Sequence, residues 1–257
     1  MQLPADAIPY LRGERFCAGY RLQLACSAPP RGRRMSDRIS LLCEITNGLS
    51  VIHAGCVDHG IEQLERQRQR GQWLHERLCA AALRCAGVDL SAEGIEYLRD
   101  HLGLTDVYCA DLAGDVPVAL TGTRWDCLVL GELLEHIDNP VEFLRRIGRS
   151  YFRGLADRLI LTVPNALCRK NAERATAGVE QINSDHRYWF TPYTISKVLF
   201  RAGFFIEDIE LAKYAPPSPG WSLRRWRKRR QERQHPLLRD TIVVTARPVV
   251  DGTPPPG

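Results

Sequence analysis

From Leu49 onward, short apolar runs alternate with longer amphipathic stretches. Runs rich in β-branched and other apolar residues predict seven strands, at 49–55, 85–91, 106–112, 125–131, 158–164, 204–214 and 240–248. Apolar positions with helical spacing predict helices at 72–84, 91–102, 139–152 and 191–203. Strands that alternate with helices indicate βαβ units around a parallel sheet, so the predicted fold class is α/β.

The ends of three predicted helices carry local signals. Ser91 is a candidate N-cap residue, because its hydroxyl can accept a hydrogen bond from the first turn. Asn139 precedes Pro140 and Glu142, which matches the preference for proline at the first helical position and for acids near the positive end of the helix dipole. Gly203 is placed to end the last of these helices in a left-handed conformation.

The length of 257 residues suits one α/β domain, which we expect at 41–248. Residues 1–40 are rich in Pro, Arg and Gly and are predicted to form a flexible N-terminal extension, in which Met35 offers an alternative start. Residues 249–257 are predicted to be a disordered C-terminal tail. The first ten residues lack the pattern of a secretory signal, and no apolar run approaches the ~20 residues of a membrane span, so a cytoplasmic location is expected.

The nine cysteines are scattered singly and form none of the CxxC pairs that are typical of zinc sites. Several lie inside apolar runs, where cysteine behaves as a small hydrophobic residue. We therefore expect reduced, mostly buried thiols and no metal site.

Glycines and acids follow three successive predicted strands. The first strand ends in "HAGCVDHG", where Gly55 and Gly60 allow a tight turn close to a ligand. Asp89 ends the second strand, where a carboxylate can accept hydrogen bonds from ribose hydroxyls. Asp111 ends the third, where it can accept from an adenine amino group. Because parallel strands end at one edge of a sheet, this series predicts a nucleoside site there.

Three further stretches resemble a known family. "WDCLVLGELLEHIDNPVEFLRRI" is similar to the fourth strand and following helix of class I S-adenosylmethionine-dependent methyltransferases, with an acid before the strand, an "LEH" loop and a nearby proline. "RLILTVPNA" resembles their fifth strand. "DHRYWFTPYTISKVLFRAGF" resembles a block of the small-molecule branch, which is similar to methyltransferase types 11 and 23. The resemblance extends from about Leu49 to Pro248.

The resemblance implies a Rossmann-like, doubly wound sheet of seven mostly parallel strands, in the order 3-2-1-4-5-7-6 with only the last strand antiparallel. It also implies S-adenosyl-L-methionine as cofactor. The expected reaction is O-methylation of a small-molecule, saccharide or lipid-linked acceptor. The rival interpretations are an RNA methyltransferase and a non-catalytic binding module with a decayed cofactor loop, while a nicotinamide oxidoreductase is disfavoured because it has no use for the "LEH" loop.

The first loop departs from the family pattern. His53 stands where the first strand usually has an acid, and Val57 and His59 stand where glycine is common, so the loop is expected to take a different path. His75 is expected to be structural, on a helix that covers the cofactor. The residues assigned to cofactor binding are Gly55, Cys56, Asp58, Asp89, Leu90, Asp111, Leu112, Gly131 and Glu132.

Two histidines are candidates for the catalytic base, because imidazole titrates near neutral pH. His136 follows the fourth strand, and His186 precedes a run of aromatic residues. Tyr188 and Trp189 are assigned to the acceptor pocket. Alternatively, the histidines position the backbone and the aromatic residues enter the core ahead of the next helix.

The segment 222–234, "SLRRWRKRRQERQ", is the strongest charge run, and Arg225 within it is assigned to acceptor binding. Three interpretations remain open: a solvated helix face, a site for anionic acceptors or lipid headgroups at a membrane surface, and a nucleic-acid contact. The last is the least favoured, because no RNA-binding module accompanies the segment.

Overall fold

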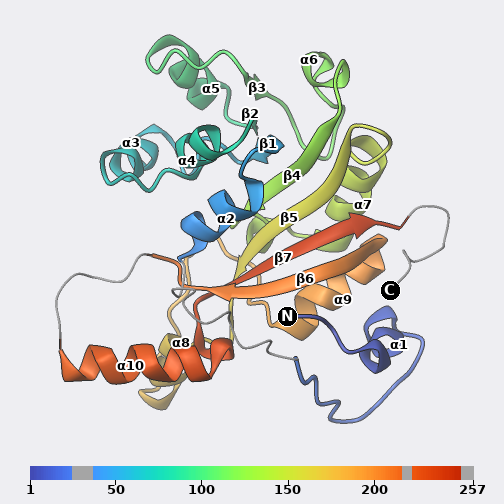
Figure 1. Cartoon of the computed structure of the whole chain (residues 1–257), viewed down its shortest axis with the longest axis vertical. Helices are drawn as coiled ribbons and strands as arrows, with labels where there is room; N and C mark the ends of the chain where they lie inside the picture. The colour runs from blue at the N-terminus through green and yellow to red at the C-terminus, as the bar shows by residue number, and fades with distance from the viewer. Residues whose placement is uncertain (25–36, 216–221, 250–257) are drawn as a thin grey trace.

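The computed structural model of the protein describes residues 1–24, 37–215 and 222–249. Its strands are β1 (Ser50–Ala54), β2 (Arg84–Asp89), β3 (Val107–Cys109), β4 (Trp125–Gly131), β5 (Ala156–Pro164), β6 (Phe204–Ala212) and β7 (Thr241–Pro248). They form one sheet in the order β3-β2-β1-β4-β5-β7-β6, as Figure 1 shows. β7 is antiparallel to β5 and β6, and the pairs among β1 to β5 are parallel. The predicted α/β class and strand order are confirmed.

The helices lie between these strands and at the N-terminus. They are α1 (Ile8–Arg12), α2 (Arg38–Thr46), α3 (Ile61–Gln69), α4 (Leu74–Ala81), α5 (Ala92–Asp100), α6 (Val118–Thr121), α7 (Pro140–Ser150), α8 (Arg169–Thr176), α9 (Pro192–Ala202) and α10 (Leu223–Gln234). Short 3₁₀ turns are η1 (Ala5–Ala7), η2 (Leu134–His136) and η3 (Pro236–Leu238). Ser91 and Asn139 cap α5 and α7 as predicted, and Gly203 ends α9 with φ 88°.

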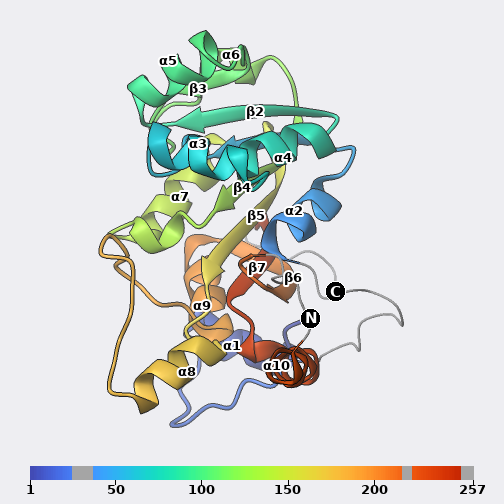
Figure 2. The ribbon, with the colours of Figure 1, turned by 90° about the vertical axis from the view of Figure 1, so that its left-hand side faces the viewer.

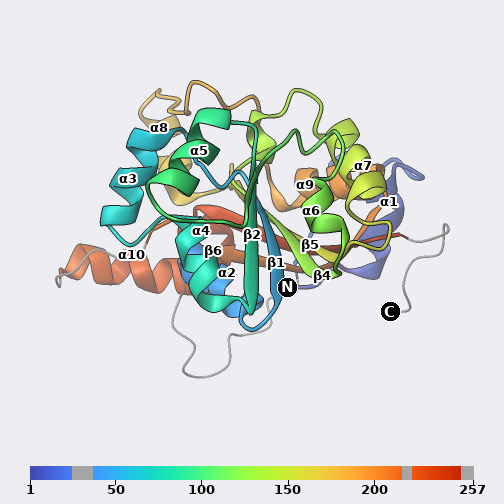
Figure 3. The same ribbon diagram turned by 90° about the horizontal axis from the view of Figure 1, so that it is seen from above.

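Helices cover both faces of the sheet (Figure 3), and alternating side chains of a strand point to opposite faces. On β1, Ile52 belongs to the larger core with residues of α7 and α9, whereas its neighbour Val51 packs with residues of α2 and α4. Both side chains are fully buried. The near-continuous apolar runs seen in the sequence therefore reflect strands covered on both faces.

The N-terminal segment differs from the expected flexible extension. Ala7 and Leu11 are fully buried, and α1 packs against α9. The amino group of Met1 donates to Asp208 Oδ1 at 2.7 Å. A five-residue helix with one buried leucine has too few turns to show a periodic pattern, so this packing left no signal in the sequence. Residues 25–36 and the tail from 250 lie outside the described residues.

The helices α2, α3, α6 and α8 were not predicted either, and two of them, α3 and α8, are strongly polar. α3 places only Leu64 in the core, and among the described residues α8 contributes none. None of the described helices combines the length and the apolar character needed to cross a bilayer.

The strand order reverses between β1 and β4, so the chain leaves these neighbouring strands in opposite directions. In open α/β sheets, ligands bind at this switch point, beyond the carboxyl ends of the strands. The connection from β5 to α9 lies beyond the same edge. Asn165 fixes its start by donating to the carbonyls of Leu237 and Arg239, both at 2.8 Å, and Thr191 fixes its end with a capping box.

Candidate active site

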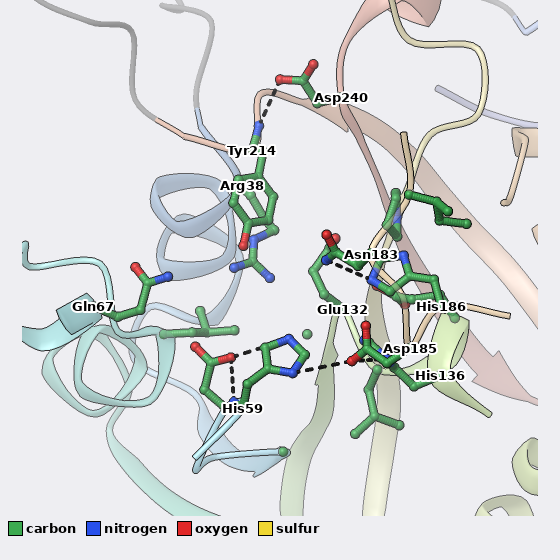
Figure 4. A pocket seen from close by; sticks show the side chains of 18 of the residues that line it. Arg38, His59, Gln67, Glu132, His136, Asn183, Asp185, His186, Tyr214 and Asp240 are labelled. Atoms are coloured by element: carbon green, nitrogen blue, oxygen red, sulfur yellow. Dashed lines mark hydrogen bonds and ion pairs between the residues drawn. The ribbon is translucent and has the colours of Figure 1, made fainter. Parts of the chain in front are cut away.

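A cavity of about 500 Å³ lies at the carboxyl ends of β1, β2 and β4, within the size range of ligand pockets. The loops after β1 and β4 line it, together with the connection from β5 to α9 (Figure 4). The structure brings eight of the predicted site residues to this cavity: Gly55, Asp58, Asp89, Gly131, Glu132, His136, His186 and Trp189.

The loop after β1 takes its left-handed conformations at three positions: Gly55 (φ 79°), Asp58 (φ 64°) and Gly60 (φ 111°). Aspartate adopts this conformation more readily than most non-glycine residues. Val57 and His59 have negative φ, so the loop does not need glycine at either position. The departure from the family pattern is thus accommodated by a path in which Asp58 makes the turn.

Asp89 links this loop to α5. Its carboxylate accepts hydrogen bonds from the N–H groups of Val57, at 2.9 Å, and Ser91, at 3.0 Å. Each oxygen keeps a second acceptor position, and the residue lines the cavity, which fits the expected contact with ribose hydroxyls. Asp111 does not line the cavity; it is exposed and accepts from the N–H of Ala113.

Other predicted cofactor residues lie around this loop without lining the cavity. Cys56 and Leu112 are buried, and Leu90 is 73% exposed. Gly131 does line the cavity, but a Cβ there would lie 2.6 Å from Leu74 Cδ2, so this glycine also allows α4 to approach β4 closely.

His53 and His75 form a buried pair, and His53 also lines the cavity. Their Nδ1 atoms are 3.2 Å apart, and burial lowers the pKa of His53 well below its ordinary value. The sulfur of Cys79 lies 3.7 Å from His75 Nε2, and Cys85 lies at the other side of the ring. His75 is 1% exposed, as a structural residue would be.

A second group, the histidine cluster, consists of His59, His136, Asp185 and His186 and faces the cavity (Figure 4). Asp185 Oδ2 lies 3.1 Å from His136 Nδ1 and 3.5 Å from His59 Nδ1. The rings of His136 and His186 meet edge to face with centroids 4.6 Å apart. Burial lowers the pKa of both His136 and His186, which favours their neutral forms.

Glu135 and Asp185 were not assigned from the sequence. Glu135 is fully buried in η2, and burial raises its pKa to about 9. Glu132, nearby, has the unusual φ of 53°. The signal for Glu135 was an acid between apolar residues in "ELLEHI", and the signal for Asp185 was its place directly before His186.

The aromatic residues of the β5–α9 connection divide between cavity and core. Trp189 lines the cavity and also an adjoining groove with Arg174 and Gln181. Phe190 is buried in the core, as the alternative interpretation expected for these aromatic residues. Tyr188 points elsewhere: its hydroxyl donates to the carbonyl of Asp138 at 2.7 Å.

The basic segment forms α10, which lies beside α8 (Figure 2). Glu232 anchors it through Lys213, whose Nζ lies 3.0 Å from the carboxylate, and Arg169 of α8 contacts Gln231. Trp226 is 47% exposed and carries the Arg230 guanidinium 5.6 Å from its ring. Arg225 lies in this helix, but its side chain is outside the described part of the structure.

The chain is similar in fold to solved methyltransferases. The small RNA methyltransferase HEN1 superposes with a TM-score of 0.54 at 15% identity; the match covers 93% of this chain but 28% of the HEN1 chain. Magnesium protoporphyrin IX methyltransferase from Synechocystis PCC 6803, solved with SAH, gives 0.47 at 17% identity and covers 82% and 80% of the two chains. An S-adenosylmethionine-dependent methyltransferase from Clostridium acetobutylicum gives 0.48 at 11% and covers 82% and 89%.

No curated protein matches the sequence. The methyltransferase-domain family matches residues 30–209, which is most of the chain. The expectation of S-adenosyl-L-methionine as cofactor is confirmed at the level of this family. Together with the strand order, this match shows that the chain belongs to the methyltransferase-domain family of class I S-adenosylmethionine-dependent methyltransferases.

Proposed function

We propose that the protein transfers a methyl group from S-adenosyl-L-methionine to a hydroxyl oxygen of a small-molecule, saccharide or lipid-linked acceptor. The observation that carries this proposal is that the histidine cluster lines the same cavity as Gly55 and Asp89. The sulfonium of the bound cofactor supplies an electrophilic methyl group. The protein therefore has to align the acceptor, exclude water and assist loss of the hydroxyl proton.

On the cofactor side, Gly55 brings the backbone close to the ligand and Asp89 accepts from the ribose hydroxyls. Asp58, Gly131 and Glu132 complete the wall that faces the cofactor. Cys56, Leu90, Asp111 and Leu112 keep their assignment to the adenosine end, and none of the four lines the cavity.

On the acceptor side, the cluster supplies His136 and His186, whose pKa values burial lowers. Asp185 Oδ2 lies 3.1 Å from His136 Nδ1, and a carboxylate at this distance favours a proton on Nδ1 and the lone pair on Nε2. Trp189 forms an apolar wall between the cavity and the adjoining groove. A group that removes a proton favours a hydroxyl acceptor, because a neutral amine attacks without prior deprotonation.

An RNA acceptor is the second candidate, and α10 is the observation that favours it. This helix carries consecutive cations and an exposed Trp226, a combination that suits phosphates and stacked bases. The fold likeness to the small RNA methyltransferase HEN1 is consistent with this candidate. We rank it second because α10 residues do not line the cavity.

Calorimetry with S-adenosylhomocysteine tests the cofactor assignment and separates an enzyme from a binding module that has lost the cofactor. Asp89→Ala should weaken binding by about 1.5–3 kcal/mol, or roughly 10- to 150-fold, because a charged acceptor is removed. Asp111→Ala is the matched control and should have the smaller effect. If the parent and a folded Asp89→Ala variant bind S-adenosylhomocysteine with equal affinity, Asp89 does not belong to the cofactor site.

An acceptor screen that measures released S-adenosylhomocysteine tests the reaction. Hydroxyl compounds should be methylated and their pre-methylated ethers should not. Turnover with single-stranded RNA but with none of the small hydroxyl compounds would transfer the proposal to the second candidate.

A further inference from the structure

The loop after β4 buries a carboxylate beside two imidazoles. One oxygen of Glu135 and one ring nitrogen each of His136 and His186 lie within 4.8 Å of one another. Glu135 has no exposed surface, and neither of its oxygens has a hydrogen-bond partner among the described residues. A buried carboxylate without a partner is strongly unfavourable, so Glu135 either holds a proton or faces a positive ligand.

The described protein groups do not supply that positive charge directly. Within residues 1–24, 37–215 and 222–249, no lysine or arginine forms a salt bridge with Glu135. Glu132 adds a second carboxylate to the same cavity, and its Oε1 is likewise buried and unpartnered in the described structure. The guanidinium of Arg38 is the cation that faces both acids across the cavity, and its Nε has no described partner either.

Each imidazole has one nitrogen engaged and one available. Asp185 Oδ2 lies 3.1 Å from Nδ1 of His136, which favours a proton there and leaves the lone pair on Nε2. The amide nitrogen of Asn183 lies 3.2 Å from Nε2 of His186, and the Nδ1 of that ring is buried without a described partner. Metal binding through Nδ1 requires the amide turned over, so that its oxygen accepts from Nε2–H and the lone pair lies on Nδ1. A carboxylate or amide behind a histidine is the usual way in which a protein fixes the tautomer and direction of a metal ligand.

We infer that Glu135, His136 and His186, with Glu132 as the fourth ligand, bind one divalent metal ion. Two imidazoles with carboxylate oxygens suit ions of the Mn²⁺ to Zn²⁺ range, and a set contributed from one wall of a cavity leaves positions open on the other side. Cysteine spacing gave no hint of this site, because none of its ligands is a thiolate.

The ion would lie on the acceptor side of the cavity, and this consequence rests on the proposed function. A hydroxyl oxygen that occupies an open position on the ion would have a lowered pKa and a fixed direction. The metal, rather than a free imidazole, would then prepare the acceptor oxygen, and its proton would leave to solvent or to Asp185.

The inference is tested by titrating Mn²⁺ into the chelator-treated full chain, without cofactor or acceptor. The electron paramagnetic resonance signal of free Mn²⁺ measures how much of the ion is bound. The parent should bind one ion per chain. Glu135→Gln and His186→Ala should lose saturable binding, and Asp185→Asn should weaken it about 10- to 100-fold by releasing the orientation of His136. Glu142→Gln and His101→Ala make the same chemical changes on the surface and should bind as the parent does.

Thermal melting guards against a variant that has simply failed to fold. Without metal, Glu135→Gln should melt no lower than the parent, because burial raises the pKa of Glu135 to about 9 and glutamine matches the shape of the neutral acid. Mn²⁺ should raise the Tm of the parent and leave that of Glu135→Gln unchanged. Absence of Mn²⁺ and Zn²⁺ binding in the parent, or unchanged stoichiometry in folded Glu135→Gln, overturns the inference.

Two further measurements distinguish this metal site from a different metal site and from the proposed function. Cys79→Ser should leave Mn²⁺ binding intact, whereas loss of binding there would move the site to His75, Cys79 and Cys85, whose ligand atoms also lie within 4.8 Å of one another. Binding of S-adenosylhomocysteine without Mn²⁺ binding would refute the metal site alone. Mn²⁺ binding without S-adenosylhomocysteine binding would refute the proposed function alone.

Discussion

The two histidine groups near the carboxyl ends of β1 and β4 use the same side chain in opposite ways. His53 and His75 are almost completely buried and contact each other and cysteine sulfurs. The histidine cluster opens into the cavity, contains Asp185, and adjoins the unpartnered carboxylate of Glu135. A neutral imidazole pair can stay buried at small cost, whereas a buried carboxylate requires a cation or a proton. The nearby acids, rather than the number of histidines, therefore distinguish the candidate catalytic group from the structural pair.

The largest expected effect comes from removing the imidazoles of the histidine cluster. His136→Ala and His186→Ala should each slow methyl transfer on the order of 100-fold or more, because the acceptor proton is no longer assisted. Affinity for S-adenosylhomocysteine should change little. Single-turnover rates with saturating cofactor, together with calorimetry, measure the two quantities separately.

The matched control is His53→Gln, which should retain methyl transfer to within a few-fold. A parallel loss of rate and cofactor affinity in His136→Ala would mean that the residue supports the cofactor or the fold. A 100-fold loss of the methyl-transfer rate in folded His53→Gln would show that the buried pair also takes part in the reaction, against the distinction between the two histidine groups.

A smaller effect is expected from pH, and it concerns the buried pair. Folding lowers the pKa of His53 from the unfolded value of 6.5 because burial disfavours the imidazolium. The unfolded chain therefore binds this proton first, so the stabilising contribution is full above pH 6.5 and is lost as the pH falls towards the folded pKa. When the pH is lowered from 7 to 5.5, the free energy of unfolding of both proteins should fall. The fall should be about 1 kcal/mol smaller for His53→Gln than for the parent.

Urea denaturation at the two pH values gives the comparison, with His186→Ala as the partly exposed counterpart. We expect a smaller difference for His186→Ala, since solvent reaches that ring. Identical pH slopes for the parent and His53→Gln would show that another group controls the acid sensitivity.

The smallest effect is expected from α10, which acts at a distance from the reacting atoms. Glutamine is substituted at Arg224, Arg225, Arg227, Lys228, Arg229 and Arg230. If the acceptor is anionic, its KM should rise a few-fold at low salt and become less salt-dependent, because screened attraction is removed. Initial rates across a salt series measure this, and cofactor affinity should stay constant.

The same variant distinguishes the three interpretations of the basic segment. Loss of salt-sensitive RNA binding, with a smaller log–log slope, would favour the nucleic-acid contact. Loss of binding to vesicles with anionic headgroups would favour a membrane surface. An unchanged KM in a parent that binds neither would leave a solvated helix face.

The strands and their order in the sheet could be predicted from the sequence, but part of the candidate site could not. Runs such as 125–131 and 158–164 predict strands because a strand that is buried on both faces has a nearly continuous apolar sequence. Gly55 and Asp89 were found because their chemistry depends on their place at a strand end. Glu135 was not assigned, because its role depends on His186, which reaches it only through the tertiary fold. α1 and α3 were not predicted because each buries too few residues to give a helical spacing of apolar positions in the sequence.

The connection from β5 to α9 is fixed at Asn165 and Thr191, while α8 between them adds nothing to the described core. The sequence of α8 can therefore diverge without disturbing the sheet or the cofactor loop, provided that the two end residues, the buried Phe190 and the cavity residues of the connection persist. Descendants of one such gene could acquire new acceptors by exchanging this single segment. The same two residues mark the splice points at which a designer would graft the corresponding segment of another methyltransferase.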